Sequence, residues 1–228
     1  MIAALFDFNG VLVDDERLHL AGFNEVLAPY GVAVSDADYD ARYIGYDDRG
    51  AFRAMLADRG LPHDDDRVAA LIGAKRAVYL RLAKDALRIF PGAAELLRAV
   101  AREVPVVIVS GALRAEIEMA LDVMRARDCV WRIVSAEDTR ACKPDPEGYL
   151  LGIERLRESA GYAIDPARCV AIEDSRAGIE AARAAGLRVL AVAQSHPPHE
   201  LREALPDAVF PSVADVRVAH LRALAERR

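Results

Sequence analysis

The sequence predicts an α/β fold, in which a doubly wound parallel sheet is interrupted by a helical insertion. Two observations predict this class. Along residues 89–228, short apolar runs rich in β-branched residues alternate with segments of helical periodicity, which is the pattern of βαβ units. Residues 15–88 show helical periodicity with no convincing strand, directly after one apolar run at the N-terminus. We therefore expect a core formed by residues 1–14 and 89–228, with residues 15–88 inserted after its first strand.

The first strand is predicted from an apolar run, and one helix of the insertion is predicted from an acidic run. Ile2–Phe6 is a short apolar run that stops at Asp7 and Gly10, so it predicts a buried strand that ends in a loop. Within the insertion, Asp64–Asp66 is expected to begin a helix, because carboxylates suit the positive N-terminal end of a helix.

The rest of the core follows from the same alternation. Pro105–Val109 is a continuous apolar run with β-branched residues, which is typical of a strand buried on both faces of a parallel sheet. Further strands are expected over 131–135, 169–172, 188–193 and 208–210, and helices over 93–103, 115–124, 146–159 and 177–185. The tract His196–His199 is expected to be a loop.

Composition excludes several classes of protein. Hydrophobic residues form 53% of the 228 residues, which supports a full core and argues against intrinsic disorder. The net charge of −6 argues against a nucleic-acid partner, which needs a basic face. Three cysteines without a paired spacing predict neither a disulfide framework nor a zinc site. No segment has the pattern of a signal peptide or a membrane span, so we expect a soluble, cytoplasmic protein with no membrane partner.

Chemically reactive side chains gather where the predicted strands end. They are Asp7, Asn9, Ser110, Gly111, Lys143, Glu173 and Asp174. Ligands of an open parallel sheet bind at the carboxyl ends of its strands, so these groups are expected to converge. The carboxylates would repel one another unless a cation neutralised them, and all-oxygen ligands favour a hard ion such as Mg²⁺. A carboxylate nucleophile, a divalent ion, a lysine and a hydroxyl are the parts needed for phosphoryl transfer through an aspartyl-phosphate.

Four segments make the sequence similar to the haloacid dehalogenase-like hydrolase superfamily. They are FDFNGVLVDDE (6–16), VVIVSGA (106–112), KPDPEGY (143–149) and AIEDSRAGIEAARAAG (171–186). The sequence most resembles the branch with a helical cap after the first motif, which holds β-phosphoglucomutase-like and phosphoglycolate phosphatase-like enzymes. The resemblance covers nearly the whole chain. It implies a Rossmann-like core with an inserted helical cap, and a monomer that acts on a small phosphorylated metabolite.

The resemblance also implies roles for the matching residues. Asp7 is the nucleophile, Ser110 hydrogen-bonds the transferring phosphoryl group, and Lys143 pairs with the nucleophile and the phosphoryl oxygens. The backbone amides at residues 8–10 and at Gly111 add further donors. This set implies a magnesium-dependent phosphatase of small phosphomonoesters, such as sugar phosphates.

The implied metal ligands include Asn9, the position that departs most from the family, whereas Val11 in place of the usual Thr is a milder variation. Mg²⁺ is held by Glu173, Asp174, the Asp7 carboxylate and the backbone carbonyl of Asn9. Phosphatases and mutases of the family usually carry a second Asp where this chain has Asn9, and that Asp serves as general acid and base. An amide cannot transfer a proton near neutral pH, and losing such catalysis typically costs about 10²- to 10⁴-fold in rate.

Asn9 leaves four readings open. The chain is a slow phosphatase, or one suited to substrates with good leaving groups, or one in which another group supplies the proton, and this is the reading we adopt. Alternatively it is a phosphate-binding or metabolite-binding pseudoenzyme, it performs other chemistry on this scaffold, or it is an Asp-to-Asn trapped variant of a phosphatase or phosphoglucomutase-like enzyme. The dehalogenase branch needs no Mg²⁺, whereas Glu173 and Asp174 are intact here. The phosphonate hydrolase branch uses a cap lysine, whereas Lys75 and Lys84 lie outside the loop near Gly45.

Specificity in this branch resides in the cap. Glu16 and His19 follow the first motif and are candidate substrate contacts or proton carriers, although for His19 we favour a hinge or cap-surface position. Arg49 could bind a distal phosphate or carboxylate through its guanidinium fork, and a solvated position beside its acidic neighbours fits equally well. Cap packing, rather than sugar stacking, is expected for Tyr39, Tyr43 and Tyr46.

Overall fold

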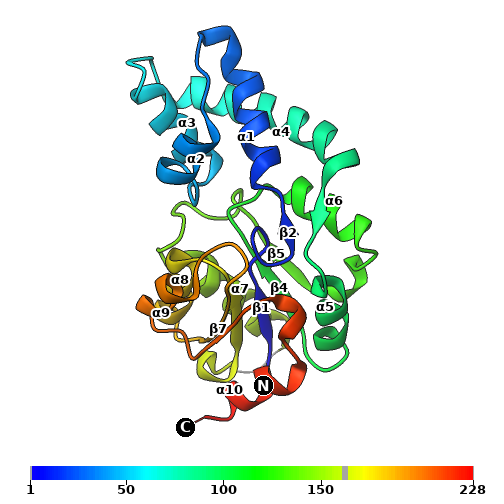
Figure 1. The fold of residues 1–228 in the computed structure, drawn as a ribbon. Coiled ribbons are helices and arrows are strands. Elements are labelled where there is room, and N and C mark those ends of the chain that lie inside the picture. The colour runs from blue at the N-terminus through cyan, green and yellow to red at the C-terminus, as the bar shows by residue number, and fades with distance from the viewer. Residues whose placement is uncertain (1, 161–163, 228) are drawn as a thin grey trace. The chain divides into compact units, whose positions relative to one another are not determined.

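The computed structural model describes residues 2–160 and 164–227, and its elements follow the predicted alternation (Figure 1). The strands are β1 (Ala4–Phe6), β2 (Val13–Asp14), β3 (Arg88–Ile89), β4 (Val106–Val109), β5 (Arg132–Val134), β6 (Val170–Glu173), β7 (Arg188–Val192) and β8 (Ala208–Phe210). The α-helices are α1 (Glu16–Leu27), α2 (Asp36–Arg42), α3 (Asp48–Ala57), α4 (Asp65–Ala86), α5 (Ala93–Ala101), α6 (Arg114–Val123), α7 (Glu147–Ala160), α8 (Arg176–Ala184), α9 (Pro198–Glu203) and α10 (Val218–Ala225). The 3₁₀ helices are η1 (Ala28–Tyr30), η2 (Arg127–Cys129), η3 (Pro166–Arg168) and η4 (Val213–Asp215). In the part of the chain that the structure describes, no helix combines the length and apolarity needed to cross a membrane.

Parallel strands form the main sheet in the order β5-β4-β1-β6-β7-β8. β1 lies between β4 and β6, with Leu5 paired to Val107 on one side and to Ala171 on the other. The chain runs outward from β1 to β5 and then crosses back to β6, a reversal of strand order that defines a doubly wound sheet. The predicted fold class is confirmed. The reversal also puts the carboxyl end of β1 beside those of β4 and β6.

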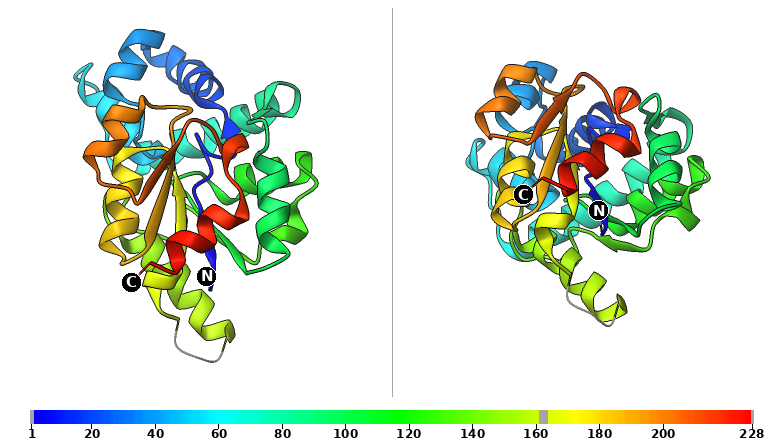
Figure 2. Two further views of the ribbon diagram at one scale, coloured as in Figure 1. Left: turned by 60° about the horizontal axis from the view of Figure 1, so that its bottom comes forward. Right: turned by 90° about the horizontal axis from the view of Figure 1, so that it is seen from below.

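Helices cover both faces of this sheet, which explains why its central strands are continuously apolar. α7 and α8 pack on one face, and α5 and α10 pack on the other (Figures 1 and 2). All residues of β4 and of β6 are buried. A strand covered on both faces has no solvent side for polar residues, so its sequence reads as an apolar run. Glu173, the buried carboxylate that ends β6, is therefore a departure that calls for a functional explanation.

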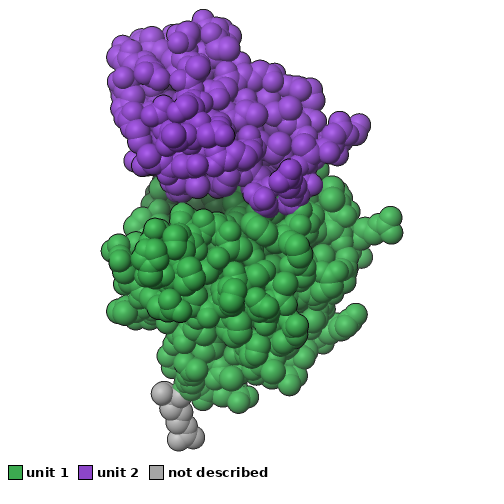
Figure 3. Space-filling view, viewed as in Figure 1, with its two compact units in different colours: residues 1–13, 89–228 green, residues 14–88 purple. Residues whose placement is uncertain are grey.

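Two compact units make up the chain (Figure 3). Unit 1 comprises residues 1–13 and 89–228 and holds the main sheet, and unit 2 comprises residues 14–88 and holds α1 to α4. Unit 2 has a hydrophobic core of its own, in which Phe23 and Phe52 pack edge to face at a centroid distance of 4.9 Å. The Asp64 side chain accepts a hydrogen bond from the Arg67 backbone N–H at 3.0 Å and caps α4, so the predicted helix start is confirmed.

Several short elements differ from the expectations. α9 begins at Pro198, inside the tract His196–His199, so the expected loop is wrong from that residue onward. Proline suits the first turn of a helix, because no intrahelical partner is needed there for its missing N–H. β2 and β3 span two residues each and form a separate two-stranded sheet, and such lengths leave no periodicity to read. α10, which covers part of the main sheet, was also not predicted.

Asp138, in the loop after β5, accepts several hydrogen bonds at the edge of the main sheet. Its carboxylate accepts from Arg114 at 2.7 Å, from Arg155 at 2.8 Å, and from the backbone N–H and hydroxyl of Ser135, both at 2.9 Å. Burial alone would raise the pKa of Asp138, but the hydrogen bonds from Arg155 and Ser135 outweigh it and hold the pKa well below its usual range. Asp138 therefore stabilises the folded protein as a carboxylate.

Asp138→Asn is expected to lower the free energy of unfolding by about 1–3 kcal/mol at about pH 7, with a smaller loss below about pH 4. A carboxyl whose pKa falls on folding contributes stability above the pKa of the unfolded chain, and that stability is lost as the pH falls toward the folded pKa. Urea unfolding at both pH values measures the difference. Asp128→Asn, at an exposed position of unit 1, is the control. A loss that is equal at both pH values would contradict this assignment.

Candidate active site

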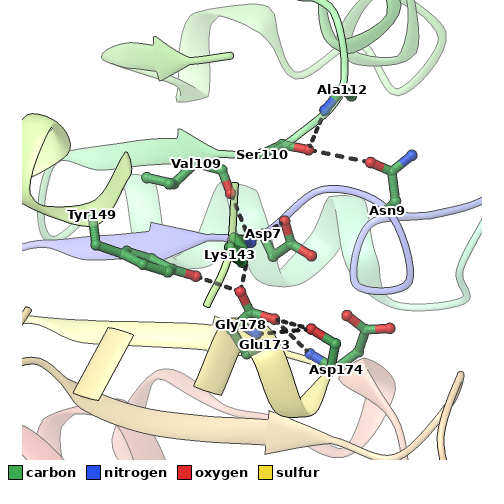
Figure 4. A network of polar contacts seen from close by, with 11 residues as sticks. Asp7, Asn9, Val109, Ser110, Ala112, Lys143, Tyr149, Glu173, Asp174 and Gly178 are labelled. Atoms are coloured by element: carbon green, nitrogen blue, oxygen red, sulfur yellow. Dashed lines mark hydrogen bonds and ion pairs between the residues drawn. The ribbon is translucent and has the colours of Figure 1, made fainter. Parts of the chain in front are cut away.

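Side chains from separate segments of unit 1 meet at the carboxyl edge of the sheet, as Figure 4 shows. Asp7 directly follows β1, Ser110 directly follows β4, and Glu173 ends β6. Lys143 comes from the loop before α7, and its Nζ donates to Asp7 Oδ1 at 2.7 Å and to Glu173 Oε1 at 2.6 Å. Carboxylate oxygens of Asp7, Glu173 and Asp174 lie within 4.8 Å of one another. The structure thus brings these predicted residues together.

Lys143 supplies positive charge to this group. Its ammonium also donates to the backbone carbonyl of Val109 at 3.2 Å, so each of its three N–H donors has an acceptor. Burial alone would lower the pKa of Lys143, but the adjacent carboxylates of Asp7 and Glu173 raise it above its ordinary value. Lys143 therefore stays protonated near neutral pH and holds the Asp7 carboxylate in place.

The acidic residues carry more negative charge than Lys143 neutralises. Asp7 and Asp174 are 7% and 5% exposed, and Glu173 is fully buried. Burial raises the pKa of Asp7 to about 7, and burial together with repulsion from Asp7 raises the pKa of Asp174 well above its ordinary value. A divalent cation would relieve this repulsion, and an all-oxygen donor set suits a hard ion. Asp7, Glu173 and Asp174 therefore form a possible metal site.

Two glycines make room for the carboxylates. A Cβ on Gly10 would lie 1.9 Å from Asp174 Oδ2, and a Cβ on Gly178 of α8 would lie 2.1 Å from the Glu173 carboxylate. Gly10 also has a φ of +75°, in the left-handed region that favours glycine. The absent side chains at these positions are thus a condition for the acidic group to form.

Tyr149 of α7 is a residue of this group that the sequence analysis did not identify. It is 1% exposed, and its hydroxyl donates to Glu173 Oε1 at 2.6 Å. Burial raises the pKa of Tyr149 well above its ordinary value, so the hydroxyl keeps its proton and remains a donor. The ring centroid lies 5.3 Å from Lys143 Nζ, within range of a cation–π interaction. In the sequence, Tyr149 is the last residue of the segment KPDPEGY (143–149), but an aromatic residue in a predicted helix is equally typical of the hydrophobic core, so no role was assigned to it.

Tyr149→Phe is expected to lower the free energy of unfolding by about 1–3 kcal/mol, because it removes a hydrogen bond to a buried carboxylate and keeps the packing of the ring. Urea unfolding measures this. Tyr46→Phe makes the same chemical change at a side chain that is 53% exposed, and it is expected to leave stability nearly unchanged. Equal effects of the two substitutions would show that the bond to Glu173 contributes nothing to stability.

Asn9 lies beside Ser110 at the same edge of the sheet (Figure 4). The Ser110 hydroxyl donates to Asn9 Oδ1 at 3.2 Å and accepts from the backbone N–H of Ala112 at 3.0 Å. Gly111, which lies between Ser110 and Ala112 in the sequence, is exposed. The Asn9 side chain and the Ser110 hydroxyl are therefore held next to each other near the carboxylates.

His19, in unit 2, belongs to a buried polar cluster. It is 9% exposed, its Nδ1 lies 2.8 Å from Lys75 Nζ, and its Nε2 lies 3.3 Å from Asp15 Oδ2. An ammonium group can only donate, so Nδ1 is the acceptor and the ring proton is assigned to Nε2, facing Asp15. The ring also packs against Tyr79 at a centroid distance of 4.7 Å. The cap-surface position expected for His19 is therefore wrong, because packing and polar partners bury it, whereas the hinge position stays a prediction.

Lys75 shows that separation in sequence is no guide to separation in space. It is fully buried, its Nζ lies 4.4 Å from the Phe23 ring centroid, and it donates to the carboxylate of Asp48. Asp48 is three positions after Gly45, so the Lys75 side chain reaches the start of α3 although the residue lies outside the Gly45 loop.

The other predicted residues of unit 2 have separate surroundings. Glu16 accepts a hydrogen bond from the Tyr39 hydroxyl at 2.8 Å, whereas Arg49 is exposed. Tyr39 and Tyr43 are buried, as cap packing requires. Tyr46 is 53% exposed, so the packing expected for it is wrong. The spacing of the tyrosines could not distinguish them, because it assumed one continuous helix, whereas α2 ends at Arg42 and both Tyr43 and Tyr46 follow it.

Comparison with known proteins identifies a hydrolase family that covers most of the chain. A family model described as "Hydrolase: haloacid dehalogenase-like hydrolase" matches residues 1–186. The protein CbbY of Rhodobacter capsulatus is 34% identical over 196 residues, covering 82% of this chain and 83% of that protein. A phosphorylated carbohydrates phosphatase of Thermotoga maritima is 28% identical, covering 86% and 87%. The crystal structure of CbbY from Rhodobacter sphaeroides with phosphate has a TM-score of 0.82 at 26% identity over 94% of this chain and 96% of that one, and a mutant of it has been solved with xylulose-(1,5)bisphosphate.

Proposed function

This chain belongs to the haloacid dehalogenase-like hydrolase family, and we propose that it is a magnesium-dependent phosphatase of small phosphorylated sugars or related metabolites, with Asp7 as nucleophile. The observation that carries the proposal is the buried Asp7 carboxylate, held by Lys143 at 2.7 Å beside Glu173 and Asp174 at the carboxyl edge of the sheet. The printed functions of the relatives support the substrate class, since one acts on phosphorylated carbohydrates and another structure holds a sugar bisphosphate.

The proposed reaction has two steps. Asp7 attacks the phosphorus of a phosphomonoester, the bond from phosphorus to the ester oxygen breaks, and an aspartyl-phosphate and an alcohol form. Water then attacks the phosphorus of the aspartyl-phosphate, so that inorganic phosphate leaves and the Asp7 carboxylate is restored. Lys143 and the Ser110 hydroxyl offset the charge on the phosphoryl oxygens, and the backbone N–H of Gly111 adds a donor.

Asp7, Glu173, Asp174 and the backbone carbonyl of Asn9 would hold Mg²⁺. When bound, the ion neutralises the crowded carboxylates and the charge on the transferring phosphoryl group. The raised pKa values of Asp7 and Asp174 support this part of the proposal, because burial together with repulsion between neighbouring carboxylates disfavours their charged forms, and a bound cation would offset both effects.

Asn9 leaves the leaving alcohol without the usual proton donor, so the proposed enzyme is slow, or the proton comes from another group or from water. Glu16, His19 and Arg49 of unit 2 remain proposed substrate-binding residues. Glu16 and His19 are the first candidates to move the proton, and both have polar partners, since Glu16 accepts from the Tyr39 hydroxyl and both ring nitrogens of His19 face polar groups.

Phosphate release from a panel of sugar phosphates, measured with Mg²⁺ and with EDTA, tests the proposal. We expect turnover with Mg²⁺ and loss of it with EDTA. We also expect Mg²⁺ to raise the Tm of the unmodified chain, because an ion that binds only the folded state stabilises it, and to leave Asp174→Asn nearly unshifted. A Tm shift without turnover would instead support the alternative, a protein that binds phosphorylated metabolites on this fold. Turnover that persists in EDTA would contradict the metal requirement.

A further inference from the structure

The loop after β1 is held by a side chain that lies far from it in the sequence. Gln194 lies in the turn after β7, and its side-chain nitrogen donates to the backbone carbonyl of Gly10 at 2.8 Å and to that of Val11 at 3.0 Å. The partners are 184 and 183 positions apart in the sequence. The contact therefore ties β7 to the loop that directly follows the nucleophile.

Both the nitrogen and the oxygen of the Gln194 side-chain amide have hydrogen-bond partners, and these partners determine which way the amide group is turned. Its oxygen accepts from the backbone N–H of Val213 at 2.9 Å and from the Ser212 hydroxyl at 3.2 Å. A side-chain amide offers two N–H donors and two oxygen lone pairs, and each has a partner here. If the amide were flipped, its nitrogen would face the Val213 N–H, a donor, and its oxygen would face two carbonyl acceptors. Neither arrangement forms a hydrogen bond, so the contacts select the orientation described. Gln194 thus bridges the loop after β1 and the start of η4.

The bridged loop carries backbone groups that the chemistry depends on. Gly10 N–H donates to the Val13 carbonyl at 2.8 Å. In a trans peptide the carbonyl of Asn9 points opposite to the N–H of Gly10, so this bond directs the Asn9 carbonyl away from Val13. The Gly10 carbonyl also accepts from the Ser195 hydroxyl at 3.2 Å. Gln194 therefore constrains the peptide that follows a proposed metal ligand.

We propose that Gln194 is a positioning residue of this site: by holding the Gly10 and Val11 carbonyls, it sets the direction of the Asn9 carbonyl for Mg²⁺ binding and the placement of Asp7 for phosphoryl transfer. The inference rests on the proposed function. Without these bonds the two carbonyls turn toward water, and the loop spends less time in the productive geometry. A displacement of about 1 Å can cost about 10²-fold in rate.

Two substitutions of Gln194 separate positioning from packing. Gln194→Met keeps the length of the side chain and removes both donors and acceptors. Gln194→Glu keeps the shape, but its ionised form has no donor for the carbonyls of Gly10 and Val11. Ser212→Ala is the matched control, because it removes one bond on the oxygen side of Gln194 and leaves both carbonyl contacts. It also removes the bond that the Ser212 hydroxyl accepts from the Ala214 backbone N–H at the start of η4, so its Tm shows what that cap contributes. For each protein, Mg²⁺ affinity is measured by isothermal titration calorimetry, alongside kcat, KM and Tm.

We expect both Gln194 variants to bind Mg²⁺ more weakly and to lower kcat by about 10- to 100-fold, with little change in KM, while Ser212→Ala behaves like the unmodified chain. If Tm falls while Mg²⁺ affinity and kcat of the folded protein are unchanged, Gln194 is only a structural tether and the inference is overturned. If the unmodified chain has no Mg²⁺-dependent turnover, the proposed function fails separately, and Mg²⁺ affinity of the variants still decides the role of Gln194.

Discussion

Replacing Asp7 with Asn is expected to lower kcat for phosphate release by about 10⁴- to 10⁶-fold. The amide lacks the anionic oxygen that attacks phosphorus, so no aspartyl-phosphate can form. The fold is expected to persist, because the pKa of Asp7 is raised to about 7 and a neutral group of the same shape suits this buried position. Lys143 also keeps Glu173 as a partner at 2.6 Å. Steady-state kinetics with Mg²⁺ and a thermal unfolding curve measure the two expectations.

The control for this prediction is Asp128→Asn, which makes the same chemical change at an exposed position of unit 1 and is expected to leave kcat unchanged. Acid quenching during turnover, followed by peptide mass spectrometry, should detect a phosphoryl adduct on Asp7 in the unmodified chain. If Asp7→Asn keeps activity within about tenfold of the unmodified chain, the nucleophile lies elsewhere and the proposed mechanism is wrong.

Replacing Asn9 with Asp is expected to raise kcat by about 10²- to 10⁴-fold, the usual contribution of general acid–base catalysis. A carboxyl group at this position can protonate the leaving alcohol and then accept a proton from the attacking water. The Ser110 hydroxyl already donates to Asn9 Oδ1 at 3.2 Å, so a carboxylate oxygen there would find a donor in place. The gain should be smallest for 4-nitrophenyl phosphate, whose leaving group needs little protonation, and largest for sugar phosphates.

Asn9→Ala is the matched control, because it removes the amide without adding an acid, and it is expected not to raise kcat. Comparable rates for the unmodified chain and Asn9→Asp would mean that another group moves the proton, and substitution of Glu16 would then be the next test. Activity confined to Asn9→Asp would mean that the chain, in its present form, binds phosphorylated ligands without useful turnover.

The arrangement of strands could be predicted because burial on both faces leaves a local mark on the sequence. The residues of β4 and β6 are buried by helices on both sides, so each strand reads as an apolar run without polar alternation. The parallel order then implied that Asp7, Ser110 and Glu173 would share one edge, which the structure shows. β2 and β3 were missed because two residues are too few to carry a periodic pattern.

The sequence by itself determined the fold class and which reactive groups stand at the strand ends, because both follow from the local order of apolar and polar residues. Only the tertiary structure decided which atoms those groups contact. Tyr149 reaches Glu173 from 24 positions away, Lys75 reaches His19 from 56, and Gln194 reaches Gly10 from 184. A periodic pattern records whether a residue is buried within its own element, whereas a side-chain hydrogen bond depends on distances that arise only when distant elements pack together.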